Sequence, residues 1–325
     1  MLTDKLSRVS IAHLPTPLEP LPRLTAQLDG PEVWIKRDDQ TGLATGGNKA
    51  RKLEYLVAEA LAQGADTLIT AGAAQSNHAR QTAAAAARFG LGRMLVLRGE
   101  EPSQVQGNLL LDQLLGAEVY WAGNLPLPEA MVQVAEEARA AGHSPYIVPY
   151  GGSNAIGASG YVAAMEELLA QSAERDKRFD HIVLASSSGG TQAGLAVGAR
   201  ALGYEGHILG ISVDPRTEVL THTLAGLATA TADHLELGLT FAPEDFGVND
   251  DYLGGGYGIV GELEREAIRI MARTEGVLLD PVYTGRAFGG LLDMIRRDVF
   301  APGERVLFWH TGGTTGLFGY GNKAL

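Results

Sequence analysis

The chain has 325 residues and no cysteine, which excludes a disulfide framework, a thiolate nucleophile and a cysteine metal site. Its formal net charge of −12 argues against a nucleic-acid partner and against an anionic membrane surface. No apolar run opens the sequence or approaches the length of a membrane span, so we expect a cytoplasmic protein that makes no membrane contact.

The first segment contains three prolines at residues 14–20 and is expected to be an extended arm rather than a helix. A short strand is predicted at residues 33–37, followed by a polar loop. Asp38 and Asp39 in that loop could suggest a metal site, but no histidine or third acid stands nearby. We therefore expect a solvated loop and no metal.

Two glycines precede Asn48 and Lys49, at the start of a predicted amphipathic helix that continues to Leu61. Asn48 is a candidate N-cap, so Lys49 would lie in the first turn, where the helix dipole and the charge of Lys52 disfavour a protonated amine. A lysine with a lowered pKa suits imine chemistry, because only the neutral amine attacks a carbonyl. The alternative is a solvated basic turn formed by Lys49, Arg51 and Lys52.

Strands and helices then alternate along the chain. In the first run we expect strands at residues 67–72, 93–97, 118–121 and 146–149, with helices at residues 77–87, 105–115 and 128–141 between them. In the second run we expect strands at residues 181–185, 208–213 and 305–309. This spacing indicates βαβ units and an α/β fold with parallel strands. We expect a smaller α/β domain at residues 46–157, inserted into a larger α/β domain formed by residues 1–45 and 158–325.

Ser188, Gly189, Gly190 and Thr191 lie between a predicted strand and a predicted helix. Free N–H groups at a helix N-terminus, together with two hydroxyls, form a suitable cup for a phosphate. The loop lacks the Walker lysine and the spacing of the dinucleotide fingerprint, so it predicts a phosphate rather than a nucleotide. The alternative is an ordinary glycine turn.

Residues 75–78 form a second turn between strand and helix, at the strand end where open α/β sheets bind ligands. Its amides and the hydroxyl of Ser76 could hold a carboxylate. Alternatively, Ser76 and Asn77 serve only as helix caps. His78 on its own is expected to be a structural or capping histidine rather than a base.

Two tyrosines follow turns in the C-terminal half of the chain. Tyr257 lies among the glycines of residues 254–258, which leave its ring free to project into a cleft, and Tyr283 follows a turn at the end of an apolar strand. Either tyrosine could instead belong to the core.

Taken in order, these motifs resemble the pyridoxal-phosphate-dependent D-cysteine desulfhydrase and 1-aminocyclopropane-1-carboxylate (ACC) deaminase family, of the tryptophan-synthase-β fold type. The resemblance rests on Gly46, Gly47, Asn48 and Lys49, on residues 51–54, 75–78, 189–194 and 310–313, and on Tyr257 and Tyr283. Residues 12–19 and 36–39 fit it too, so it spans nearly the whole chain. It implies fold type II, with two open, twisted, mostly parallel sheets flanked by helices, the cofactor in the cleft between the domains, and a homodimer.

The resemblance also implies roles for individual residues. Lys49 would bind pyridoxal 5′-phosphate as a Schiff base, Asn77 would hydrogen-bond its phenolic oxygen and Thr311 would face its pyridine nitrogen. The phosphate would be held by Lys52 and by Ser188, Gly189, Gly190 and Thr191. Catalysis is assigned to Lys49, Ser76, Tyr257 and Tyr283. Contact with a small amino-acid substrate is assigned to Asn48, Gln75, Ser76, Asn77, His78 and Thr284.

The implied reaction is a deaminating β-elimination that yields pyruvate and ammonia. ACC deaminases carry Glu after the second tyrosine and Leu at the position of Thr311, so Thr284 and Thr311 favour the desulfhydrase branch and D-cysteine as substrate. L-cysteate is an alternative, and its sulfonate should require a further cation such as Arg80 or Arg286. An ACC deaminase and a serine/threonine dehydratase are further alternatives. A non-catalytic phosphometabolite-binding protein is disfavoured, because such a protein would not need Lys49.

Overall fold

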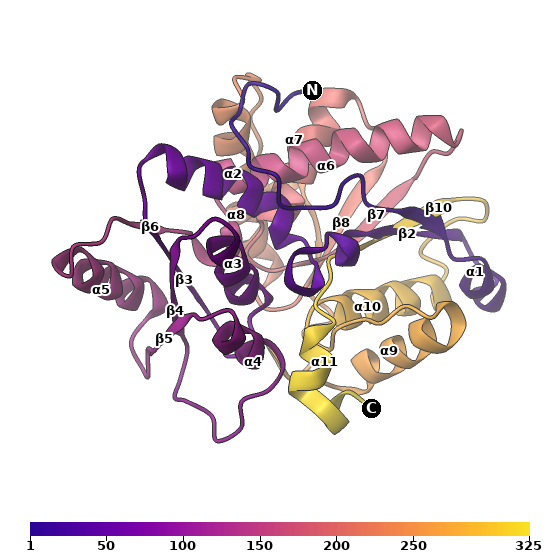
Figure 1. The fold of residues 1–325 in the computed structure, drawn as a ribbon. Helices are drawn as coiled ribbons and strands as arrows, with labels where there is room; N and C mark the ends of the chain where they lie inside the picture. The colour runs from indigo at the N-terminus through magenta and orange to yellow at the C-terminus, as the bar shows by residue number, and fades with distance from the viewer.

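Two β-sheets organise the chain, which the computed structural model describes over residues 1–325 (Figure 1). The larger sheet has the strand order β1-β2-β10-β7-β8-β9 and the smaller sheet has the order β5-β4-β3-β6. All neighbouring strands run parallel, except that β1 is antiparallel to β2. The expected α/β fold with two mostly parallel sheets is therefore confirmed.

The strands of the larger sheet are β1 (Leu18–Pro20), β2 (Glu32–Arg37), β7 (His181–Ser186), β8 (His207–Ser212), β9 (Gly247–Asn249) and β10 (Arg305–His310). Those of the smaller sheet are β3 (Thr67–Gly72), β4 (Gly92–Leu97), β5 (Glu118–Trp121) and β6 (Pro145–Ile147). The helices are α1 (Pro22–Leu28), α2 (Lys49–Ala62), α3 (Asn77–Arg88), α4 (Gly107–Leu114), α5 (Leu127–Ala140), α6 (Ala155–Glu174), α7 (Gly190–Leu202), α8 (Thr217–His234), α9 (Glu262–Glu275), α10 (Thr284–Arg296) and α11 (Thr315–Tyr320). Five short 3₁₀ turns complete the chain: η1 (Asp38–Gln40), η2 (Leu43–Thr45), η3 (Tyr150–Gly152), η4 (Pro243–Asp245) and η5 (Gly321–Ala324).

The predicted alternation is confirmed, with boundaries that move by a few residues. The last strand of the smaller sheet ends at Ile147 rather than at Pro149, because a proline has no N–H to donate to a neighbouring strand. Strand β10 lies in the middle of the larger sheet, between β2 and β7, so the two ends of the chain meet there. The domain boundaries at residues 46 and 157 remain a prediction.

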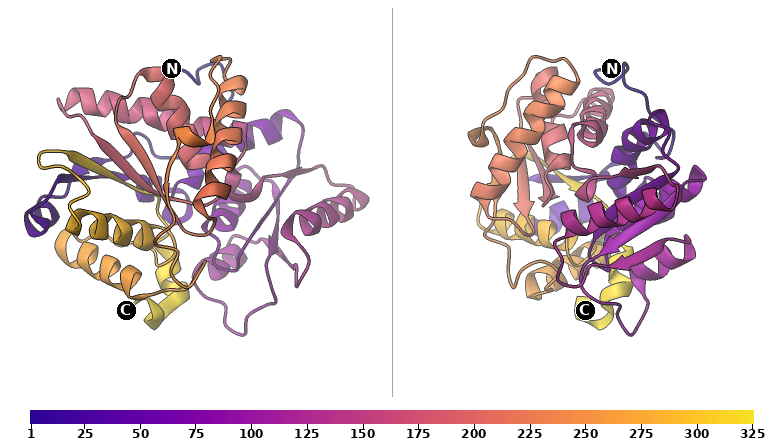
Figure 2. Two further views of the ribbon diagram at one scale, coloured as in Figure 1. Left: turned by 180° about the vertical axis from the view of Figure 1, so that it is seen from behind. Right: turned by 90° about the vertical axis from the view of Figure 1, so that its left-hand side faces the viewer.

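Helices cover both faces of the larger sheet, as Figure 2 shows from behind and from the side. On one face, α9 and α10 enclose the largest apolar cluster, which includes Val33, Phe288 and Phe308. On the other face, α6 and α7 pack over a cluster that includes Trp34 and Trp309. Because β2, β10, β7, β8 and β9 run parallel, the loops that follow them lie at the same edge of the sheet. No helix of the chain is both long enough and apolar enough to cross a membrane.

Candidate active site

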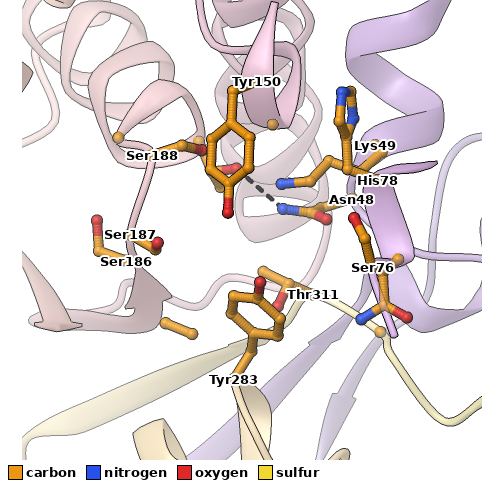
Figure 3. Close-up of a pocket in the computed structure, with 16 residues that line it drawn as sticks. Asn48, Lys49, Ser76, His78, Tyr150, Ser186, Ser187, Ser188, Tyr283 and Thr311 are labelled. Carbon is orange, nitrogen blue, oxygen red and sulfur yellow. Dashed lines mark hydrogen bonds between the residues drawn. The ribbon is translucent and has the colours of Figure 1, made fainter. Parts of the chain in front are cut away.

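A pocket lies where the start of α2 meets the loops after β3, β7 and β10 (Figure 3). It contains about 650 Å³ of empty space, including the open solvent at its mouth. The predicted site residues that line it are Asn48, Lys49, Ser76, Asn77, His78, Ser188, Gly189, Thr191, Tyr283 and Thr311. Sequence reasoning did not assign the other lining residues to the site: Tyr150, Gly151, Ala185, Ser186, Ser187 and Gly312.

The loop before Lys49 requires glycine. Gly46 and Gly47 have φ values of 73° and 126°, and a Cβ on Gly46 would lie 1.9 Å from the carbonyl oxygen of Asp39. The N–H of Gly47 donates to the hydroxyl of Thr41 at 2.8 Å. These contacts fix the point at which α2 begins and direct Lys49 into the pocket (Figure 3).

Lys49 is the first residue of α2, and burial lowers the pKa of its amine to about 8. The pKa is lowered as expected, but burial is its cause, not the neighbouring charge of Lys52. The predicted capping role of Asn48 is wrong. Its backbone is already helical and its side chain makes no cap, because its Nδ2 donates to the hydroxyl of Thr191 at 3.0 Å. That bond joins the start of α2 to the start of α7.

Lys52 lies next to the first turn of α7. Its Nζ contacts the carbonyl oxygen of Gly151 at 3.1 Å and the hydroxyl of Ser153 at 3.2 Å. A Cβ on Gly190 would lie 2.9 Å from the same Nζ. Burial lowers the pKa of Lys52 well below its ordinary value, and the charge of Lys49 adds to this effect. An anion bound here would restore the charged form of the amine.

The hydroxyls of Ser153 and Ser188 complete the predicted phosphate cup, between Lys52 and the start of α7. Ser153 accepts a hydrogen bond from the N–H of Gly190 at 3.2 Å, and its oxygen lies 2.8 Å from that of Ser188. Gly189 has a φ of 84°, a left-handed conformation that glycine adopts readily. Sequence reasoning missed Ser153, although the run of glycines at residues 151–152 before it was a signal of the same kind as the loop at residues 188–191. The alternative of a solvated basic turn is wrong, because Arg51 and Lys52 are buried.

Ser76 and Asn77 open α3 in different ways. The hydroxyl oxygen of Ser76 caps the helix by accepting from the N–H of Ala79 at 3.1 Å. The Oδ1 of Asn77 accepts from Arg80 Nη1 and from Asn108 Nδ2, both at 3.1 Å. Because these donors fix the orientation of the amide, its NH₂ group is directed toward Gly313 and the pocket.

His78 lines the pocket and has the structural contact that the sequence predicted. Its Nε2 lies 2.8 Å from the hydroxyl of Thr70, which itself donates to the carbonyl oxygen of Val148 at 2.9 Å. The hydroxyl oxygen therefore accepts a hydrogen bond from Nε2, which leaves Nδ1 without a proton. Burial lowers the pKa of His78 well below its ordinary value, so the ring is neutral.

The hydroxyls of Tyr257 and Tyr283 lie 2.5 Å apart, with only Tyr283 on the pocket. Burial raises the pKa of both phenols, so both are protonated. Asp280 holds the turn by accepting the backbone N–H groups of residues 282–284 and the hydroxyl of Thr284. Thr284 is fully buried in this arrangement and does not line the pocket, so its predicted contact with the substrate is not observed.

Gln75 also lies outside the pocket, because its amide bonds to the carbonyl oxygen of Gln106 and the N–H of Asn108. The arginines considered for a sulfonate are occupied elsewhere. Arg286 pairs with Glu264 at 2.6 Å and donates to three carbonyl oxygens, and Arg80 donates to four neutral oxygens. Neither arginine lines the pocket.

The expected solvated loop at residues 38–39 is wrong at Asp38, which is fully buried. Its carboxylate accepts two hydrogen bonds from Arg51, at 2.9 Å each, and one each from Tyr161 and Trp309. Asp38 therefore anchors α2 instead of binding a metal. The chain contains no cluster of three or more side chains suited to hold a metal ion.

Residues 9–312 match a family model described as "Pyridoxal-phosphate dependent enzyme". The chain belongs to this family. It is 45% identical to a D-cysteine desulfhydrase of Klebsiella pneumoniae (strain 342) over 97% of each chain. It is also 44% identical to a putative 1-aminocyclopropane-1-carboxylate deaminase of Pyrococcus horikoshii, over 100% of this chain and 97% of the relative.

A crystal structure of an ACC deaminase homologue superposes with a TM-score of 0.91 at 41% identity, covering 99% of this chain and 97% of the other. A fungal L-serine ammonia-lyase from Rhizomucor miehei shares the fold, with a TM-score of 0.67 at 17% identity, covering 93% of this chain and 94% of the other. The protein is a pyridoxal-phosphate-dependent lyase with the type II fold. The donors in its pocket suit this cofactor, since Lys49 offers an amine to an aldehyde and the Lys52 cup offers N–H, O–H and amine donors to a phosphate.

Proposed function

We propose that this protein catalyses the deaminating β-elimination of D-cysteine to pyruvate, sulfide and ammonia. The main support for this proposal is the charge of the pocket. Lys49 is its one lining cation, Lys52 lies behind it in the cup, and no arginine reaches it. A neutral thiol side chain needs no further cation, whereas the sulfonate of L-cysteate would. Relatives at 44–46% identity that are named D-cysteine desulfhydrase support the same choice.

Four groups of the chain would hold the cofactor. Lys49 would bind it covalently, and Lys52 with the α7 cup would hold its phosphate. Asn77 would donate its fixed NH₂ to the phenolic oxygen, and Thr311 would contact the pyridine nitrogen. When bound, pyridoxal phosphate supplies an electron sink that makes the α-proton of an amino acid removable.

The amine of Lys49 is the group in the pocket best suited to take that proton. With a pKa near 8, an appreciable fraction is neutral at physiological pH, and no carboxylate lines the pocket to compete as a base. His78 is a poorer base, because burial lowers the pKa of its ring well below the ordinary value. Lys49 would therefore accept the α-proton at Nζ.

Ser76 and Tyr283 would orient the substrate. The oxygen of Ser76 already accepts from the helix backbone, so its proton remains for the substrate carboxylate. The two phenols share one short bond, and the second phenolic proton can point toward the departing sulfur. The hydroxyls of Tyr150 and Tyr283 face each other across the pocket (Figure 3).

Thr311, the residue proposed to face the pyridine nitrogen, has a hydroxyl, and no Asp or Glu lines the pocket. A hydroxyl would leave that nitrogen largely unprotonated, and the weaker electron sink would favour elimination over transamination.

ACC deaminase is the second candidate, because one relative and the superposed crystal structure carry that name. Thr284 does not line the pocket, so it no longer counts against ACC deaminase. Of the two threonines that differ from the ACC deaminase pattern, only Thr311 lies in the pocket.

The proposal is tested by incubating the holoenzyme with D-cysteine, L-cysteine, L-cysteate and ACC. Pyruvate is assayed with sulfide or sulfite for the three-carbon substrates, and 2-oxobutanoate with ammonia for the four-carbon ACC. We expect pyruvate and sulfide from D-cysteine. Pyruvate and sulfite from L-cysteate at a higher kcat/KM would overturn the assignment, and 2-oxobutanoate and ammonia from ACC would establish the second candidate.

A further inference from the structure

Arg80 on α3 is fully buried behind the pocket and joins three of the loops that form it. Its Nη2 donates to the carbonyl oxygen of Gly46 at 2.9 Å, in the loop that leads to Lys49. Its Nη1 donates to Asn77 Oδ1 at 3.1 Å and to the hydroxyl of Thr315 at 3.0 Å, just after the turn that contains Thr311. One guanidinium thus touches the segments that carry three proposed cofactor contacts.

None of these contacts compensates the charge of Arg80. Its four acceptors are neutral oxygens, including Asn108 Oδ1 at 2.6 Å, and no carboxylate forms an ion pair with it. A buried cation without a nearby anion is costly. Burial lowers the pKa of Arg80 to about 10, while the charges of Asp112 and Asp280 oppose this shift.

Asp112 is the acid placed to supply that charge. It lies one helical turn after Asn108 on α4, on the same face of the helix, and is fully buried. Neither of its oxygens accepts a hydrogen bond from the protein. Burial raises the pKa of its carboxyl to about 7, and the charge of Arg80 works against this rise. Burial of each charged group therefore costs free energy, and the opposite charge of the other group reduces that cost.

Asp280 is less suited to this role. Its carboxylate already accepts four hydrogen bonds from the turn at residues 282–284. Asp112 has no such commitment, and the pocket does not use it.

We propose that Arg80 and Asp112 form a buried positioning pair, in which Asp112 provides the counter-charge that keeps Arg80 in contact with the Lys49 loop, Asn77 and Thr315. Asp112 touches neither substrate nor cofactor and acts through Arg80. The pair also joins α3 and α4 of the smaller sheet to α11, which follows the central strand β10 of the larger sheet. The proposal rests on the cofactor contacts proposed above, but not on the identity of the substrate.

The test compares Asp112→Asn, which keeps the size and removes the charge, with Asp112→Glu, which keeps the charge. Glu101→Gln, an exposed acid in the same part of the chain, is the control. Each cofactor-free protein is titrated with pyridoxal phosphate, following the absorbance band of the bound cofactor, and its thermal unfolding is measured by circular dichroism.

We expect Asp112→Asn to weaken cofactor binding about tenfold, because Arg80 loses its counter-charge, and to shift the absorbance maximum of the bound cofactor because Arg80 then holds Asn77 less firmly. Asp112→Glu should recover most of the affinity, and Glu101→Gln should behave as the parent. A folded Asp112→Asn protein with the parent affinity and spectrum would overturn the proposal. Because this titration needs no amino acid, its failure is distinguishable from a wrong substrate.

A double-mutant cycle tests whether Asp112 acts through Arg80. Arg80→Gln removes the charge that Asp112 compensates, so it should weaken cofactor binding by itself. In the Arg80→Gln background, Asp112→Asn should have little further effect. If the loss of cofactor affinity in the double variant equalled the product of the two single losses, the two residues would act independently. This result would contradict the proposed pair. The cycle compares the effect of Asp112→Asn on cofactor affinity in two backgrounds, so it decides the question even if Asp112→Asn alone lowers stability.

Discussion

At the scale of single residues, the two tyrosines should have unequal importance. Tyr283 lines the pocket, whereas Tyr257 reaches it only through the 2.5 Å bond between their hydroxyls. We expect Tyr283→Phe to lower kcat about 100-fold, the lower range for loss of a proton-donating group, and Tyr257→Phe to have a smaller effect. Steady-state kinetics with D-cysteine measure both, and equal losses would show that the pair acts as one unit.

Ser153 is the residue-scale test of the phosphate cup. Ser153→Ala removes contacts with Lys52, Ser188 and Gly190, and should weaken the binding of pyridoxal phosphate about tenfold. Ser103→Ala, at an exposed serine away from the site, is the matched control. Unchanged affinity in Ser153→Ala would show that the phosphate lies elsewhere.

At the scale of elements, α2 carries the proposed catalytic lysine and is anchored by a buried charge network. Arg51 pairs with Asp38 at 2.9 Å and with Glu167 at 2.9 Å, and Lys36 pairs with the same glutamate. The network connects α2 to η1, to strand β2 and to α6. Arg51 lies two residues after Lys49, so the network fixes the helix close to the amine.

We expect Asp38→Asn to lower the free energy of unfolding by about 3–5 kcal/mol, because it leaves Arg51 with less compensation in a buried site. Glu262→Gln, which breaks an exposed pair with Arg269, should change it little. Urea unfolding of both variants measures the difference. If the two variants were equally stable, the network would have no special role.

The elements themselves could largely be predicted from the sequence, because buried parallel strands appear as short apolar runs separated by helices. The strand order could not, since the pairing of Arg37 with His310 joins opposite ends of the chain. The loops at Lys49 and at residues 188–191 were found through their glycines, which the backbone requires there. Ser153 and Tyr150 were missed, because only the fold shows that η3 lies beside α7. Asp38 was expected in a solvated loop, because the residues that bury it and bond to it are distant in sequence.

At the scale of the whole molecule, the buried amines make the stability of the cofactor-free protein depend on pH. The pKa of Lys49 falls from 10.5 in the unfolded chain to about 8 in the fold, so between these values the unfolded chain binds more protons. Stability should therefore rise as pH increases above about 8. The pKa of Lys52 is also lowered by burial, so Lys52 contributes to the rise in the same direction. Lys49→Met should therefore reduce the rise in stability without abolishing it. Denaturant unfolding at several pH values measures the slope, and an unchanged slope in Lys49→Met would contradict the buried amine.

We propose that the pocket between the two sheets cleaves the carbon–sulfur bond of D-cysteine with a cofactor held by Lys49. The most direct measurement is the amount of sulfide, pyruvate and ammonia that the holoenzyme releases from D-cysteine, with Lys49→Ala assayed in parallel. We expect equal amounts of the three products from the holoenzyme and none from the variant. Absence of sulfide and pyruvate with D-cysteine, or full activity in Lys49→Ala, would contradict it.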